Sequence, residues 1–215
     1  MRLRHVKNAS KQIDNHPEYI LSIGRKETYL LNNAFKDKQP LVLEIGAGKG
    51  QFCHSLAKNT PNINVLAIER FDSVIVRALE RVLVDPLKNL YLVRMDAEQL
   101  IDCINDHSVE KMYLNFSDPW PKVKHEKRRL THSGFLAMYE TLLVEGGEIE
   151  FKTDNRALFE YSVKSMNNYG MIIKHISLDV HADDDPMNIV TEFEERFSKD
   201  GPIYKILASF EEAKK

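Results

Sequence analysis

The chain has 215 residues, of which 43% are hydrophobic and 29% are charged, and its formal net charge is -2. These values fit one globular α/β domain and exclude a polycation, so any nucleic-acid surface must be local. Two cysteines without CxxC spacing argue against a disulfide or zinc framework. Without a signal-peptide core or an apolar run of membrane-spanning length, we expect a cytoplasmic protein with no membrane partner.

The N-terminal segment differs from the rest of the chain. Residues 1–38 are polar and weakly patterned, and we predict a basic arm with a helix near 25–35. Its cations include Arg2, Arg4, Lys7 and Lys11. Residues 39–215 are predicted to form a single domain.

From Leu41 onward, short apolar runs alternate with stretches of helical periodicity. The predicted strands and helices follow in chain order: strands at 41–45, 64–69, 90–96, 111–116 and 147–154, and helices at 50–58, 73–84, 135–144 and 157–169. Two late strands, 171–180 and 202–210, have no clear helix between them. The pattern predicts a Rossmann-like α/β fold with a mostly parallel seven-stranded sheet, an antiparallel edge pair, and helices on both faces.

The stretch EIGAGKGQF at 44–52 reads as a strand end, a glycine turn and a helix start. Gly46, Gly48 and Gly50 allow tight backbone geometry and the close approach of a ligand. Their GxGxG spacing differs from the GxGxxG of dinucleotide sites, and Glu44 would repel a phosphate. We therefore expect a ligand that carries no phosphate here.

Acidic residues end the next two predicted strands. Glu69 lies about twenty residues past the glycine turn, where an acid that binds ribose hydroxyls is expected. Asp96 follows the third strand and is placed to meet an adenine edge. S-adenosylmethionine, which has a ribose, an adenine and a sulfonium but no phosphate, fits this set. The alternative is coincidence, since glycine loops and acids at strand ends are common.

The stretch NFSDPWPKVKHEKRRL at 115–130 joins a carboxylate to a dense run of cations. Asp118 follows the fourth strand in a turn that Pro119 and Pro121 stiffen, as catalytic positioning requires. Trp120 is expected to pack as core or wall rather than to stack on a base. The cations suit the phosphates of an RNA, and a solvated helix face is the alternative.

Five motifs together resemble the bacterial tRNA (guanine-N7-)-methyltransferase family: EIGAGKGQF, NFSDPWPK, HEKRRL, FKTDN and TEFEERF. The likeness covers nearly the whole chain, and NFSDPWPK followed by HEKRRL is its most specific part. The resemblance implies a class I, S-adenosylmethionine-dependent methyltransferase. Its substrate would be N7 of the guanosine at position 46 in the variable loop of tRNA.

The resemblance also assigns roles, motif by motif. Cofactor contacts would be made by Glu44, Gly46, Gly48, Glu69, Asp96 and Asp118, with Asp118 also the catalytic residue. Substrate contacts would be made by Lys122, Asp154, Thr191, Glu192, Phe193 and Glu194. The RNA-contacting segment would be Lys124, His125, Glu126, Lys127, Arg128 and Arg129.

The chain departs from the family pattern in three places. Val123 and Lys124 stand where the usual motif has two basic residues, and Phe193 lacks the hydroxyl of the usual tyrosine. The stretch 181–188 is unusually acidic for a neighbour of an RNA site. These changes bear on substrate affinity and leave the acids of the cofactor site intact.

Some of these residues also have a purely structural interpretation. Thr191 and Glu194 have the spacing of a capping box, and Asp154 is placed to cap the helix that follows it. No histidine-rich ligand set occurs, and we expect no metal. Rival functions are a methyltransferase acting on another nucleic acid or on a protein amide, a nicotinamide dehydrogenase, and a non-catalytic RNA-binding module. We expect tRNA as the partner of a monomer or homodimer.

Overall fold

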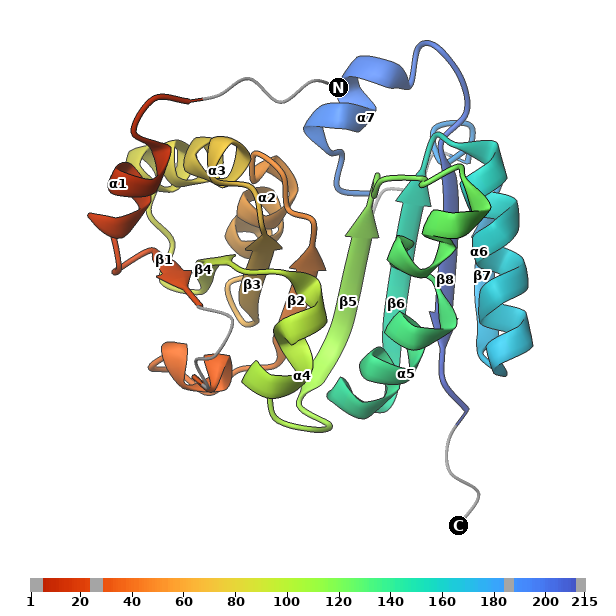
Figure 1. The fold of residues 1–215 in the computed structure, drawn as a ribbon, viewed down its shortest axis with the longest axis horizontal. Coiled ribbons are helices and arrows are strands. Elements are labelled where there is room, and N and C mark those ends of the chain that lie inside the picture. Colours follow the sequence, from red (N-terminus) through yellow and green to blue (C-terminus); the bar gives the residue numbers. More distant parts are fainter. Residues whose placement is uncertain (1–5, 24–28, 184–187, 212–215) are drawn as a thin grey trace. The chain divides into compact units, whose positions relative to one another are not determined.

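The computed structural model describes residues 6–23, 29–183 and 188–211 (Figure 1). The chain divides into two compact units, Met1–Asn105 and Asp106–Lys215. Each unit contains strands that alternate with helices, as the sequence predicts for an α/β protein. No helix of the described ranges has both the length and the apolar character that crossing a bilayer requires.

The first unit is built on four parallel strands in the order β1-β4-β3-β2. Their bounds are β1 Ile20–Ser22, β2 Leu41–Ile45, β3 Asn64–Glu69 and β4 Leu90–Arg94. Every residue of β2 and β3 is buried, which is typical of parallel strands covered on both faces. The helices are α1 Ala9–Asp14, η1 Leu31–Ala34, α2 Gln51–Asn59, α3 Asp72–Val84, η2 Ala97–Gln99 and α4 Leu100–Cys103, where η marks a 3₁₀ helix.

The second unit has the strand order β5-β6-β8-β7. Its strands are β5 Val109–Asn115, β6 Leu143–Thr153, β7 Ile172–Ser177 and β8 Tyr204–Ser209. β5 and β6 are parallel, whereas β8 runs antiparallel to both of its neighbours. The helices are η3 Val123–Arg128, α5 Ser133–Leu142, α6 Arg156–Tyr169 and α7 Glu192–Phe197. The antiparallel edge that the sequence predicts is therefore confirmed.

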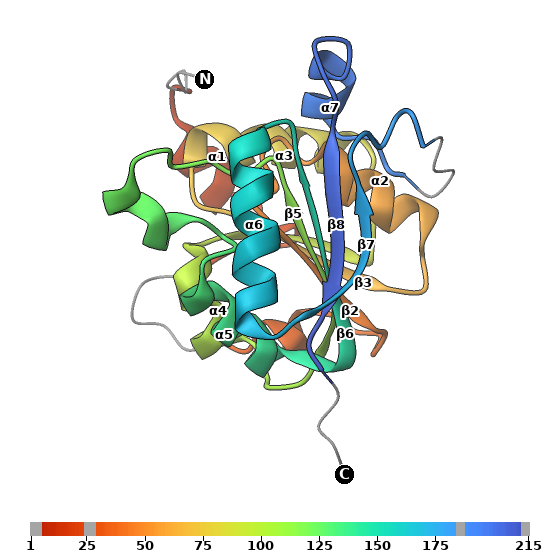
Figure 2. The ribbon, with the colours of Figure 1, turned by 90° about the vertical axis from the view of Figure 1, so that its right-hand side faces the viewer.

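Helix α6 shows why this part of the sequence folds as predicted. It begins at Asn155, whose side chain accepts a hydrogen bond from Leu158 N at 2.9 Å, and it ends at Gly170 with a left-handed φ of 95°. Leu158 and Met166 belong to its buried face. α6 lies along the strands of its own unit and packs against β6, β7 and β8 (Figure 2).

The structure differs from the sequence prediction in its short elements. The described residues contain eight strands rather than seven, because Ile20–Ser22 pairs with β4. The helix predicted at 25–35 lies partly outside the described residues, and its described part forms only the 3₁₀ helix Leu31–Ala34. α7 lies between the two late strands, where no clear helix was expected. Elements of three to six residues hold too little periodicity to be recognised.

Candidate functional site

The loop between β2 and α2 has the left-handed backbone that its glycines permit. Gly46, Gly48 and Gly50 have φ angles of 82°, 59° and 77°. The amides of Gly46 and Ala47 both donate to Ile68 O, at 2.8 and 2.9 Å. These two bonds fix the loop against the end of β3.

The three glycines serve two different purposes. A Cβ on Gly50 would lie 2.6 Å from the Cβ of Ala78, so this glycine allows α2 to pack against α3. A Cβ on Gly46 would meet nothing within 4 Å, and one on Gly48 would meet only Gly46 O at 4.0 Å. The backbone at Gly46 and Gly48 therefore borders open space, which suits a ligand that approaches closely.

Glu69, at the end of β3, connects this loop to the strand. Its Oε2 accepts from Gly48 N at 3.2 Å, and its Oε1 accepts from Arg70 N at 2.8 Å and Phe71 N at 2.9 Å. Burial raises the pKa of the Glu69 carboxyl, and the three backbone hydrogen bonds oppose that shift. The predicted ribose acid thus also organises the glycine loop.

Glu44 places a buried carboxylate in β2, directly before the loop. It is only 2% exposed. The Cys53 thiol in α2 donates to Gly50 O at 3.3 Å, and burial together with the nearby Glu44 carboxylate raises the pKa of that thiol well above its usual value. Cys53 is therefore an inert packing residue, and the charge at this strand end is negative.

Asp96 caps the 3₁₀ helix that follows β4. Its Oδ1 accepts from Glu98 N at 3.3 Å, and its backbone N donates to Gln99 Oε1 at 3.4 Å, which completes a capping box. Its Oδ2 also lies 3.4 Å from a guanidinium nitrogen of Arg70. The side chain is half-exposed, so it remains accessible to a ligand while it caps the helix.

In the second unit, the turn after β5 holds two large residues in the left-handed region. Phe116 has a φ of 50° and Trp120 a φ of 41°, a conformation that bulky side chains rarely adopt. Phe116 N donates to Lys152 O at 2.8 Å, which anchors the turn on β6. Asp118 is exposed at the middle of this turn.

Arg129, the last cation of the basic run, stabilises the same turn. Its Nε donates to Pro119 O and its Nη2 to Trp120 O, both at 3.1 Å. Its guanidinium also lies over the ring of Tyr161, 4.2 Å from the centroid. The RNA contact predicted for Arg129 is untested, and the structure gives it this internal role.

Trp120 is half-buried, in partial agreement with the expected wall-packing role. The Arg128 guanidinium lies 4.9 Å from its ring centroid, and the His125 ring lies 5.7 Å away. Two residues of the predicted RNA segment therefore cover the tryptophan. A cation over an indole face is worth about 0.5–1 kcal/mol where it is exposed.

The basic run itself lies in η3 and the residue before it. Lys122, Lys124, Lys127 and Arg128 are exposed, and across the described part of the chain none of them pairs with a carboxylate. Beside them lies a polar groove of about 360 Å³. Its lining includes Glu126, His132, Tyr161, Lys164 and Ser165. Glu126, in the predicted RNA segment, is half-buried, and burial together with the Glu126 carboxylate raises the pKa of Tyr161.

Asp154 follows β6 and is exposed. Its interpretation as a helix cap is wrong, because Asn155 caps α6. The carboxylate is therefore not used by the helix start.

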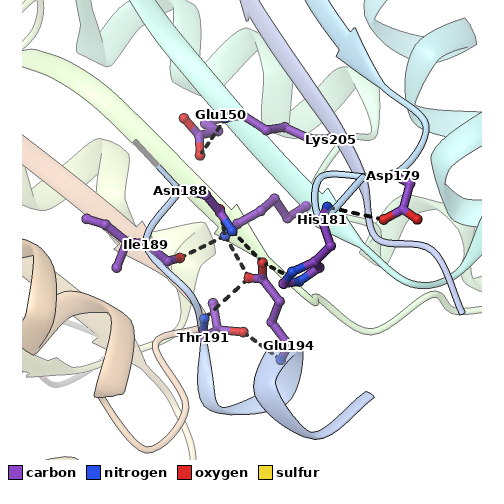
Figure 3. Close-up of polar contacts among 9 residues, drawn as sticks. Glu150, Asp179, His181, Asn188, Ile189, Thr191, Glu194 and Lys205 are labelled. Carbon is purple, nitrogen blue, oxygen red and sulfur yellow. Dashed lines mark hydrogen bonds and ion pairs between the residues drawn. The ribbon is translucent and has the colours of Figure 1, made fainter. Parts of the chain in front are cut away.

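The predicted substrate residues at 191–194 form the start of α7 (Figure 3). Thr191 Oγ1 accepts from Glu194 N at 3.0 Å, and Glu194 Oε2 accepts from Thr191 N at 3.3 Å, so the capping box is present. Glu192 is half-buried, and Phe193 is 36% exposed. The Phe193 ring lies 4.8 Å from that of Phe116, which brings this segment to the turn that carries Asp118.

Sequence reasoning missed Lys152 in β6. Its side chain is fully buried and forms an ion pair with Glu194 at 2.9 Å. The available signal was a lysine at the carboxyl end of a predicted strand, in FKTD. Among the described residues, no group of three or more His, Cys, Asp or Glu is placed to hold a metal ion.

A family model described as "Putative methyltransferase" matches residues 38–206. The chain belongs to this methyltransferase family. The family membership supports S-adenosylmethionine as the cofactor, in agreement with the glycine loop and the three acids of the first unit.

Solved methyltransferase structures have the same fold at low sequence identity. The 16S rRNA methyltransferase KamB has a TM-score of 0.63 and 11% identity, over 89% of this chain and 99% of that one. An antibiotic-related methyltransferase has a TM-score of 0.59 and 17% identity, over 79% and 86%. An S-adenosylmethionine-dependent methyltransferase from Aquifex aeolicus has a TM-score of 0.57 and 14% identity, over 80% of this chain and 82% of that one. The predicted Rossmann-like methyltransferase fold is confirmed.

Proposed function

We propose that this methyltransferase transfers the methyl group of S-adenosylmethionine to N7 of the guanosine at position 46 in the tRNA variable loop. The observation that carries the proposal is a set of exposed cations shortly after Asp118 that have no carboxylate partner among the residues the structure describes: Lys122, Lys124, Lys127 and Arg128. The family matched by the chain includes tRNA guanine-N7 methyltransferases, which supports the same substrate.

The first unit supplies the residues that would hold the cofactor. A Cβ on Gly46 would meet nothing within 4 Å and one on Gly48 only Gly46 O at 4.0 Å, so the backbone there is open to the close approach of a ligand. Glu69 and Asp96 would accept hydrogen bonds from ribose hydroxyls and the adenine amino group. Bound S-adenosylmethionine supplies an electrophilic methyl group on a sulfonium.

The chemistry needs alignment and charge stabilisation rather than a base. Guanine N7 carries a lone pair and no proton, so the S–CH₃ bond breaks as the N7–CH₃ bond forms, and the positive charge moves onto the guanine. Asp118 and Asp154 would accept hydrogen bonds from the N1 and N2 donors of the guanine. These bonds strengthen as the base becomes cationic, so they favour the transition state over the bound substrate.

The basic run would hold the RNA through its phosphates. Exposed cations that have no internal carboxylate partner can exchange counterions for phosphate oxygens, which gives affinity without reading sequence. Removing the methyl acceptor base should therefore abolish transfer and leave most of the RNA affinity in place.

The test is transfer of a labelled methyl group to an unmodified tRNA transcript, followed by nucleoside analysis. The matched control is the same transcript with the variable-loop guanosine replaced. We expect 7-methylguanosine from the parent transcript only. Label in another nucleoside would overturn the target, and label in protein substrates only would overturn the RNA assignment.

The rate of the methyl-transfer step should show no dependence on deprotonation of the substrate at guanine N1. A single-turnover pH profile measures this dependence. A rate that rises with the ionisation of N1 would contradict catalysis by orientation and charge stabilisation.

A further inference from the structure

Lys152 is a fully buried lysine in β6 that contacts residues 188–194. Figure 3 shows the polar residues of this segment, with Asn188, Thr191 and Glu194 drawn together. Lys152 Nζ donates to Asn188 Oδ1 at 3.0 Å, to Ile189 O at 2.9 Å and to Glu194 Oε2 at 2.9 Å. Three partners match the three protons of an ammonium group. A buried charge is tolerated only when it is paired and hydrogen-bonded in this way, so Lys152 requires this segment in place.

The carboxylate of Glu194 is just as fully occupied. Its Oε2 accepts from Lys152 Nζ and from Thr191 N, at 2.9 and 3.3 Å. Its Oε1 accepts from Asn188 Nδ2 at 2.7 Å and lies 3.1 Å from His181 Nε2. A carboxylate offers about four acceptor sites. Three of those of Glu194 accept hydrogen bonds from this chain, and His181 Nε2 lies beside the fourth. In this arrangement no acceptor site of Glu194 remains for a guanine.

The network joins segments that are distant in the sequence. It connects β6, the loop after β7, residues 188–189 and the start of α7. Between Thr191 and Glu194, the side chain of Phe193 is partly exposed to solvent and packs on Phe116. Because Thr191 and Glu194 are both held by hydrogen bonds, the two residues between them are held in position as well.

We propose that Lys152 is a positioning residue for the substrate site, and that Glu194 acts as its buried counter-charge rather than as a contact to the base. This inference rests on the proposed function for its substrate and deepens it. The ammonium group of Lys152 holds residues 188–194 against the strand, and the exposed residues of the segment receive the nucleotide.

The structure offers a discriminating double-variant experiment. Lys152→Met and Glu194→Gln each remove one charge and leave the other buried without its partner. The double variant Lys152→Met/Glu194→Gln removes both charges. Lys111→Met is the matched control, because Lys111 also lies in a strand of this unit and pairs with Glu150 at 2.9 Å, outside the 188–194 segment.

We expect each single variant to raise KM for tRNA about tenfold, with a smaller change in kcat and an unchanged Kd for S-adenosylmethionine. The double variant should lie closer to the wild type than either single variant, since neutralising both members of a buried pair is less harmful than removing one. If Glu194 contacted the base, Glu194→Gln would lower kcat and the double variant would be no better. That outcome would overturn the proposal.

Hydrogen exchange separates this proposal from the proposed function. In Lys152→Met, amide protection should fall at least about tenfold across residues 188–197, and amides of β2 and β3 should be unchanged. Unchanged protection in 188–197 would overturn the positioning role, whatever the substrate. Failure of the wild type to methylate tRNA would instead overturn the proposed function and leave the exchange result decisive for Lys152.

Discussion

The loop after β2 and the turn after β5 both follow strands of the parallel part of the fold, and both use left-handed backbone, yet with opposite residue types. The loop uses Gly46, Gly48 and Gly50, which reach positive φ without strain. The turn uses Phe116 and Trp120, for which such a conformation costs about 1–2 kcal/mol each. The loop lacks side chains at its left-handed positions, whereas the turn carries two bulky ones there at a cost in backbone strain.

The bonds that hold the two segments reflect the same difference. In the loop, backbone amides donate to Ile68 O and to the Glu69 carboxylate, so the neighbouring strand end stabilises it. In the turn, Arg129 reaches back over nine and ten residues to two carbonyls, and Phe193 packs on Phe116. A strained turn therefore depends on distant residues, which makes it sensitive to substitutions elsewhere.

The largest effect should come from the carboxylate that the turn presents. Asp118→Asn keeps the size of the side chain and removes the charge that would stabilise a cationic guanine. We expect the single-turnover rate of methyl transfer to fall about a thousandfold, or roughly 4 kcal/mol. Asp200→Asn, at an exposed acid of the same unit, is the control, and an equal loss in both variants would contradict the role.

Substitutions in the glycine loop should change the free energy of unfolding by amounts that differ between Gly50 and Gly46. Gly50→Ala places a Cβ 2.6 Å from Ala78 in a backbone with φ of 77°, so we expect a loss of about 3 kcal/mol in the free energy of unfolding. Gly46→Ala meets open space and should cost only the backbone strain, about 1 kcal/mol. Chemical denaturation of both variants measures the difference, and equal losses would show that the two glycines are not distinct.

The fastening of the turn is tested by Arg129→Lys. Lysine keeps the charge and cannot span both carbonyls or stack on Tyr161, so the turn should loosen and kcat should fall about tenfold. Arg77→Lys is the matched control, because Arg77 pairs with its helical neighbour Glu80, far from the turn in the sequence. A wild-type kcat with a raised KM would indicate that Arg129 serves the RNA instead.

The smallest effect should come from the exposed cations. Lys124→Gln/Lys127→Gln should raise Kd for tRNA about fivefold and reduce the salt dependence of binding by about two phosphate contacts. The control, Lys58→Gln/Lys174→Gln, removes two exposed lysines that already pair with Asp85 and Glu148. If the salt dependence of tRNA binding were unchanged in Lys124→Gln/Lys127→Gln, these two lysines would not contact the RNA phosphates.

The elements that sequence predicts well are those whose pattern is local and repeated. The runs 41–45 and 64–69 are mostly apolar and agree with β2 and β3 at both ends. The capping box at Thr191 and Glu194 was readable from spacing alone, and it is present at the start of α7. Hydrophobic runs and cap spacings are decided by neighbours in the chain, so they need no knowledge of the fold.

The remainder depends on contacts between distant residues. Lys152 and Glu194 lie 42 residues apart, and the sequence around each residue does not predict that they form an ion pair. The left-handed φ of Phe116 and Trp120 could not be predicted from the sequence either, because neither position is a glycine. The role of Arg129 was also not predictable. In the sequence it is one more cation of the basic run, and in the structure it donates to two carbonyls of the turn.

The position of β8 has a consequence for the order in which the second unit can assemble during synthesis. β8 pairs with β6 on one side and with β7 on the other, although both precede it in the chain. Until residues 204–209 leave the ribosome, those two strands present unpaired edges, which are prone to join other chains. The unit that would bind RNA is therefore completed only after translation of β8, which gives a nascent-chain chaperone a defined interval in which to act.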